Sequence, residues 1–180
     1  MTAATRIRVT TLLAVIAALA GCILPVILRK KKYKCCLLVI SAAGILYFTV
    51  LSKTPAESRT FNLMLFWNYG RWSQIEVRHE IIQNILLFMP YGAALCAVGA
   101  RYPVGIAALT TLSVELTQYF FRLGLCEADD LMHNTLGAAL GILVYKIACD
   151  YVGQKEREKK RQQRKRRANT PKAQAFRRRK

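Results

Sequence analysis

The chain has 180 residues, of which 53% are hydrophobic, and its 28 Lys and Arg against 10 Asp and Glu give a formal net charge of +18. This length suits one domain, and the apolar content excludes an intrinsically disordered protein. Six cysteines in 180 residues fall well below the density of a disulfide scaffold. The hydrophobic residues stand in long blocks, with the charges between and after them, which is typical of a membrane protein with a basic tail.

Five apolar segments predict five transmembrane helices, because a helix needs about 20 apolar residues to cross the hydrocarbon core. The segments are 9–28, 35–51, 81–100, 103–121 and 131–149. The first two contain no charged residue, whereas the last three carry polar side chains. Uncharged runs of this length are rare in soluble chains. We therefore predict an all-α, polytopic membrane bundle over residues 1–152.

Basic residues predict the orientation, because short basic loops stay in the cytoplasm. The loop 29–34 carries five Lys and Arg, and the tail 153–180 carries 14 Lys and Arg against two Glu. With five crossings both stretches fall inside, so we expect the N-terminus outside and the C-terminus in the cytoplasm. The tail lacks a periodic apolar face, so we expect it to be disordered or to fray from the last helix. Anionic lipid headgroups are its expected partner, and we do not expect nucleic-acid binding, because no folded module accompanies the charges.

The N-terminus allows a second interpretation. Arg6 and Arg8, an apolar run and then Leu19-Ala20-Gly21-Cys22 resemble a bacterial lipoprotein signal, which would make Cys22 the first residue after cleavage. The apolar run continues to Leu28, and cleavage would leave the basic loop outside. We therefore favour an ordinary first helix.

Polar side chains inside three of the predicted helices indicate a functional site, because such groups are costly in a membrane. Glu115 and Gln118 share a face of the fourth helix, and Asp130 and Asn134 share a face of the fifth. All fall in the halves predicted to lie outside, so we expect one outward-facing polar cavity. Its predicted ligand-binding residues are Asn84, Glu115, Gln118, Glu127, Asp129, Asp130 and Asn134. The alternative is that these groups only hold the helices together, with Asp129 capping a helix N-terminus.

Four residues are predicted to serve helix packing. Gly137 and Gly141 form a small-xxx-small pair, which lets another helix backbone approach closely. Pro90 removes a backbone hydrogen bond and should kink the third helix, and Gly92 follows on that helix.

These motifs, in this order, resemble the VanZ-like family of bacterial membrane proteins. The matching stretches are Asn84–Gly92, Glu115–Gln118 and Asp129–Gly137, followed by Gly141, and the resemblance covers roughly 61–145. The family often has Asp where Glu127 stands and Arg where Gly124 stands. It is named for a protein linked to low-level resistance to teicoplanin-type glycopeptides. The resemblance thus implies a multi-pass protein of the bacterial plasma membrane with a role in the cell envelope.

Three function hypotheses follow. The first is non-catalytic binding of an envelope lipid, a cell-wall precursor or a glycopeptide in the polar cavity. The second is a membrane enzyme for a lipid-linked substrate, with Glu115 and Asp130 as acid and base or as ligands of a divalent cation. The third is a structural or regulatory partner protein. We favour the first, and we expect no cofactor and no metal, since no CxxC pair, HExxH motif or nucleotide fingerprint is present.

Overall fold

The structure is a computed structural model that describes residues 3–28, 30–55, 61–124 and 126–168. Within these ranges five helices are long and apolar enough to cross a membrane, which confirms the predicted all-α membrane fold. The chain divides into two compact units, Met1–Tyr145 and Lys146–Lys180. The helices are α1 (Ala3–Ile27), α2 (Lys31–Leu46), α3 (Ile75–Val98), α4 (Pro103–Phe121) and α5 (Ala128–Ala168).

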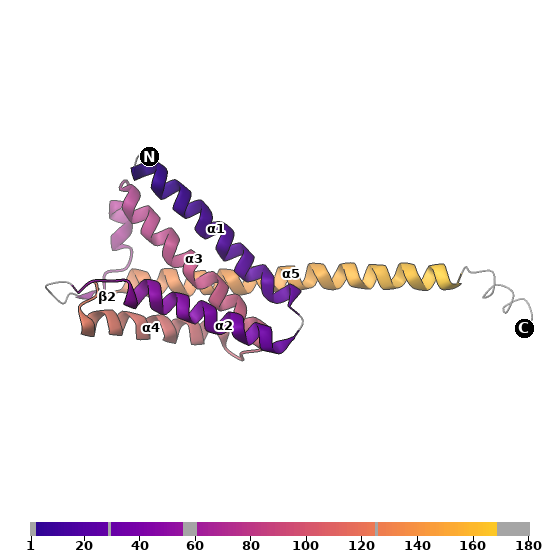
Figure 1. The fold of residues 1–180 in the computed structure, drawn as a ribbon. Helices are drawn as coiled ribbons and strands as arrows, with labels where there is room; N and C mark the ends of the chain where they lie inside the picture. The colour runs from indigo at the N-terminus through magenta and orange to yellow at the C-terminus, as the bar shows by residue number, and fades with distance from the viewer. Residues whose placement is uncertain (1–2, 29, 56–60, 125, 169–180) are drawn as a thin grey trace, which may run out of the picture. The chain divides into compact units, whose positions relative to one another are not determined.

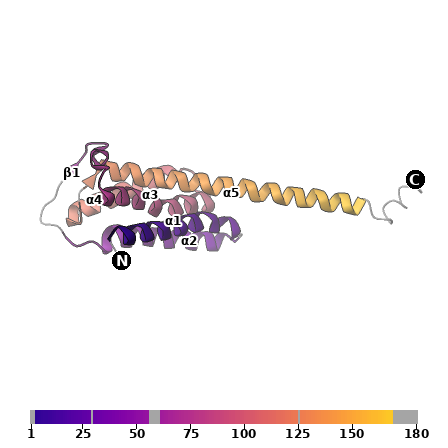
Figure 2. The ribbon, with the colours of Figure 1, turned by 90° about the horizontal axis from the view of Figure 1, so that it is seen from above.

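The first unit is built around α3, which packs against α1, α2 and α4. Seen from above, α1 and α2 form one layer, and α3 and α4 lie behind it (Figure 2). The central core includes Phe88, Tyr91 and Leu95 of α3 packed against Ile45 of α2. By contrast, apolar side chains on α1 and α2 such as Leu12 and Val39 stay more than half exposed, as expected for helices that face lipid.

Two short connections meet at one end of this unit. β1 (Phe61–Asn62) pairs in parallel with β2 (Cys126–Glu127), in the register Phe61 with Cys126 and Asn62 with Glu127. We call this end of the bundle the strand end. A π-helical turn, η1 (Tyr47–Leu51), extends α2 toward it, and a short 3₁₀ helix, η2 (Trp67–Arg71), precedes α3. In Figure 1, α1 and α2 come together at their connection and diverge toward the strand end.

α5 is longer than the sequence indicated. It ends at Ala168, past the predicted end at residue 149, so residues 153–168 continue the last helix, which was one of the two arrangements we expected for the tail. The physical reason is composition, because residues 154–168 are almost all Gln, Lys, Arg, Glu and Ala, which favour the helix. Glu156 also precedes Lys160 by four residues, the spacing that stabilises a helix through its side chains. Residues 169–180 lie outside the described ranges.

Candidate binding cavity

Glycines set how closely α3 and α5 approach. A Cβ atom added to Gly137 or Gly141 would collide with the backbone of α3 at Ile85 or Met89, and one added to Gly92 would collide with Ala138. These glycines therefore allow backbone-to-backbone contact. The close approach brings the polar start of α5 beside α3.

A second close contact joins α1 to α3. A Cβ atom on Gly21 would lie 2.8 Å from the Cβ of Pro90, so glycine is required where the two helices cross. Cys22, the next residue, is completely buried. α1 packs along α3, and near its start Thr10 Oγ1 lies 3.3 Å from His79 Nε2. The start of α1 diverges from α2 (Figure 1).

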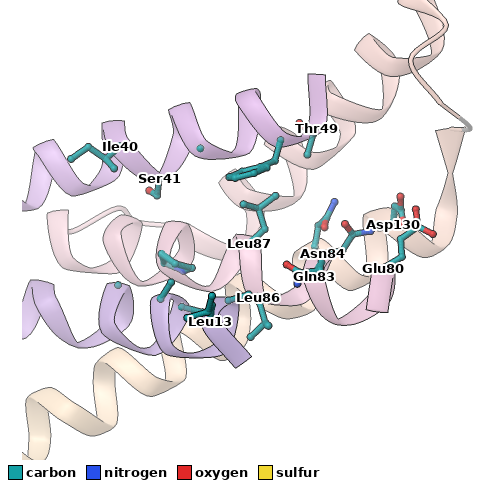
Figure 3. A pocket seen from close by; sticks show the side chains of 18 of the residues that line it. Leu13, Ile40, Ser41, Thr49, Glu80, Gln83, Asn84, Leu86, Leu87 and Asp130 are labelled. Carbon is teal, nitrogen blue, oxygen red and sulfur yellow. Dashed lines mark hydrogen bonds between the residues drawn. The ribbon is translucent and has the colours of Figure 1, made fainter. Parts of the chain in front are cut away.

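The space between α1, α2 and α3 contains a cavity of about 730 Å³. Toward the strand end its lining is polar, and farther along the helices it is apolar. Figure 3 shows this division, with Gln83, Asn84 and Asp130 at one side, Ile40 at the other, and Leu86 and Leu87 between them. Ser41 lies beside Ile40, and the other polar lining residues are Thr49, Lys53, Glu80, Gln83, Asn84, Glu115, Gln118, Asp130 and Asn134.

Hydrogen bonds hold the polar end together across several elements. Asn84 Nδ2 of α3 donates to Asp130 Oδ1 of α5 over 2.8 Å. Gln118 Nε2 of α4 donates to the backbone oxygen of Thr49 in η1, also over 2.8 Å. Because each bond links two elements, the polar side chains are positioned by the fold rather than by their own helix.

Five of the seven predicted ligand-binding residues line the cavity, and two do not. The five are Asn84, Glu115, Gln118, Asp130 and Asn134. Glu127 and Asp129 are absent from the lining and instead contact the segment before α3. Our placement of these two residues in the cavity is therefore corrected.

Asp129 holds the segment Phe66–Trp72, and we call this arrangement the loop clamp. The carboxylate of Asp129 is 1% exposed, and it accepts hydrogen bonds from the backbone N–H of Phe66 (2.6 Å) and of Asn68 (3.0 Å). Phe66 has a positive φ of 65°, an unfavourable conformation for a residue with a side chain. The hydrogen bonds that Asp129 accepts help to stabilise this turn, so the carboxylate anchors a loop.

Other side chains complete the loop clamp. Glu127 accepts a hydrogen bond from Asn68 Nδ2 (3.1 Å), and the Tyr69 hydroxyl lies 3.2 Å from Nε2 of the buried His133. Tyr69 also stacks on Trp72, with the ring centroids 5.7 Å apart. These aromatic rings remain 42% and 46% exposed, which suits the membrane interface.

Lys53 lines the cavity although it was not among the predicted site residues, and the same holds for Thr49, Glu80 and Gln83. The Nζ atom of Lys53 lies 3.6 Å from the point that a Cβ on Gly124 would occupy, and it interacts electrostatically with Glu115 and Asp130. A cation thus stands beside Gly124, the position where the family often has arginine. Its signal in the sequence was its place as the first charged residue after the second apolar run.

The side chains of Glu115 and Asp130 also influence the residues of β2. Glu115 Oε2 accepts a hydrogen bond from the backbone N–H of Glu127 over 3.1 Å, which ties α4 to this strand. Burial raises the pKa of the neighbouring Cys126 thiol, and the charges of Glu115 and Asp130 raise that pKa further. Cys126 is a free thiol, and its protonated form is favoured by these surroundings.

The chemistry available to the cavity is hydrogen bonding and charge pairing. In the part of the chain that the structure describes, no group of three or more His, Cys, Asp or Glu is arranged to hold a metal ion. The polar end presents carboxyl groups, amides and one ammonium group.

Comparison with known proteins shows which family this chain is similar to. The model of the VanZ/LLP1 family matches residues 35–149, which is more than half of the chain. The chain belongs to the VanZ/LLP1 family. It is 26% identical over 115 residues to Protein VanZ of Enterococcus faecium, a match that covers 62% of this chain and 68% of that protein. No solved structure matches the chain. The family match starts at α2, so it includes the polar end of the cavity but not the wall that α1 supplies to this VanZ-family protein.

Proposed function

We propose that this VanZ-family protein is a multi-pass protein of the bacterial plasma membrane that raises tolerance to teicoplanin-type glycopeptides. Its cavity would bind an amphiphilic component of the envelope, which is a lipid, a cell-wall precursor or the antibiotic. The observation that carries the proposal is the cavity itself. Side chains from the three matching motifs, on α3, α4 and α5, converge at its polar end.

The proposed orientation places this polar end at the outer surface. The basic loop 29–34 and the basic stretch of α5 favour the cytoplasm. The strand end is separated from loop 29–34 by the length of α2, so it faces the cell wall in this orientation. A ligand from the outer leaflet or from the periplasmic side would then meet the polar end first.

Cleavage before Cys22 would be incompatible with this proposal. α1 forms one wall of the cavity with Ala14, Ala17 and Gly21, and all three precede Cys22. We therefore expect the functional protein to keep α1, which intact mass measurement of the purified protein can check.

The test is antibiotic susceptibility in a host that expresses the wild type, Glu115→Gln or Asp130→Asn at matched membrane levels. We expect the wild type to raise the inhibitory concentration of teicoplanin, and each variant to lose most of that increase, because both carboxylates line the cavity. Glu76→Gln is the matched control, since Glu76 is exposed on the first turn of α3 and does not line the cavity.

Two results would contradict the proposal. One is a wild type that behaves like the empty vector. The other is full tolerance in both cavity variants at normal protein levels, which would leave the carboxylates with only a structural role.

A further inference from the structure

The cavity is amphiphilic along its length. Its polar end is formed by residues such as Asn84 and Asp130, and Ile40 lies at its other end (Figure 3). The lining also includes the apolar side chains of Leu37 and Leu86. A uniformly polar ligand would leave the apolar end empty, and a hydrocarbon would leave the polar end unpaired. The lining therefore matches a molecule with one polar and one apolar part.

The depth of the cavity corresponds to one membrane leaflet. The lining residues of α3 extend from Glu80 to Pro90, and an α-helix rises about 1.5 Å per residue, so this distance is about 15 Å. The hydrocarbon core of a bilayer is about 30 Å thick. The cavity, with its polar end included, is therefore about as deep as one leaflet. The volume of about 730 Å³ is in the range of sites that enclose a single small ligand.

The polar end contains more acidic than basic groups. Three of its side chains are carboxyl groups, from Glu80, Glu115 and Asp130, and one is an ammonium group, from Lys53. A carboxylate can accept about four hydrogen bonds, so Glu115 and Asp130 retain acceptor capacity beyond the bonds already described. This end therefore favours a ligand that donates hydrogen bonds and carries positive charge.

Asn134 provides an independent indication of a ligand. Its side chain lines the cavity and is 3% exposed, yet its Oδ1 atom has no hydrogen-bond partner among the described residues. A buried acceptor without a partner is costly, and a ligand that donates a hydrogen bond removes that cost.

We propose that the cavity binds an amphiphile with a primary amine next to an anionic group. The amine donates to Glu115, Asp130 and Asn134, the anionic group lies beside Lys53, and one acyl chain fills the space between α1 and α2. This inference rests on the proposed function, because it names the chemical class of the ligand for the same site. The ammonium and phosphate of an aminophospholipid headgroup have this chemistry.

The experiment compares three lysolipids with the same acyl chain, titrated into the purified full chain in detergent micelles. Lysophosphatidylethanolamine has a primary amine and a phosphate. Lysophosphatidylcholine has the same charges without an N–H donor, and lysophosphatidylglycerol lacks the amine. We expect the first to bind about tenfold more tightly than the other two, as measured by native mass spectrometry.

Substitutions at the two ends of the cavity test the binding of the amine and of the acyl chain separately. Glu115→Gln and Asp130→Asn should remove the preference for the amine but keep a weaker binding of all three lipids. Gly44→Leu should weaken all three, since Gly44 lines the apolar part and no atom lies within 4 Å of its added Cβ. Gly105→Leu is the matched control, because Gly105 is exposed on α4 outside the cavity.

Equal affinity of the wild type for the three lysolipids would overturn the inference, and so would unchanged binding by Gly44→Leu. Selective binding of the amine lipid without any effect on teicoplanin susceptibility would leave this inference standing and reject the proposed function. Tolerance that depends on Glu115 without selectivity among the lysolipids would reject the inference alone.

Discussion

The cavity and the loop clamp meet at the start of α5, where Asp130 belongs to the first and Asp129 to the second. Asp130 lines the cavity and accepts a hydrogen bond from the Asn84 side chain. Asp129 is almost fully buried and accepts two hydrogen bonds from loop backbone. Successive residues of a helix point about 100° apart, so adjacent carboxylates reach different surroundings. Adjacent acidic residues at the start of a helix can therefore have different roles, since Asp130 lines a cavity and Asp129 holds a loop.

The groups that surround Asp129 and Asp130 also differ. In the loop clamp the donors are backbone groups of Phe66 and Asn68, which the protein itself supplies. At the polar end of the cavity, the Oδ1 atom of Asn134 is buried without a partner in the described chain. The loop clamp also contains a buried atom without a partner in the described chain, Nδ1 of His133. The two carboxylates differ because Asp129 receives its hydrogen bonds from loop backbone, whereas Asp130 lines a cavity.

The largest expected effect is on folding, from Asp129→Ala. This change leaves the N–H groups of Phe66 and Asn68 without their acceptor, and we expect a loss of about 3 kcal/mol or more in the free energy of unfolding. Asp130→Ala should cost about 1 kcal/mol, since one side-chain hydrogen bond is lost. Denaturant unfolding of the purified proteins in micelles measures both. Asp150→Ala, at an exposed site of α5, is the control. Equal losses for Asp129→Ala and Asp130→Ala would remove the distinction between cavity and loop clamp.

A smaller effect is expected where α5 crosses α3. Gly141→Ala forces a methyl group against the backbone of Met89, and overpacking of this kind costs about 2 kcal/mol. The misplaced helix should also weaken the contact of Asn84 with Asp130, so lysolipid binding should fall with stability. The control is Gly105→Ala, which has room for the methyl group and should gain about 0.5 kcal/mol from helix propensity. A Gly141→Ala protein as stable as this control would contradict the close approach.

The smallest effect concerns Cys126, which does not line the cavity. The pKa of its thiol is raised by the charges of Glu115 and Asp130. Its raised pKa means less thiolate at neutral pH, so a variant with Cys126 alone should react with maleimide more slowly than one with the exposed Cys35 alone. Raising the pH should increase the Cys126 rate, because more of the thiol loses its proton. Glu115→Gln should lower the pKa of Cys126 and speed the reaction. A rate that Glu115→Gln leaves unchanged at every pH would show that the carboxylate does not act on this thiol.

Much of the fold could be predicted from the sequence because membrane helices are specified locally. Runs of apolar residues indicated five spans, and the structure has α1 to α5 at these positions. The end of α5 could not be found in this way, since 153–168 has no apolar face, and only its helix-forming composition keeps it helical. The convergence of Asn84, Glu115 and Asp130 followed from their similar depths in adjacent helices.

The sequence by itself determined the number of helices able to cross a membrane, the all-α class, and which polar residues lie within those helices, because each depends on the composition of one segment. Only the tertiary structure decided that Asp130 faces a cavity while Asp129 faces a loop, that Lys53 lies beside Gly124, and that α1 supplies an apolar wall. These facts depend on the rotation and the crossing of helices, which glycine contacts such as Gly21 with Pro90 fix. Periodicity within one segment contains no information about which neighbour a face will meet.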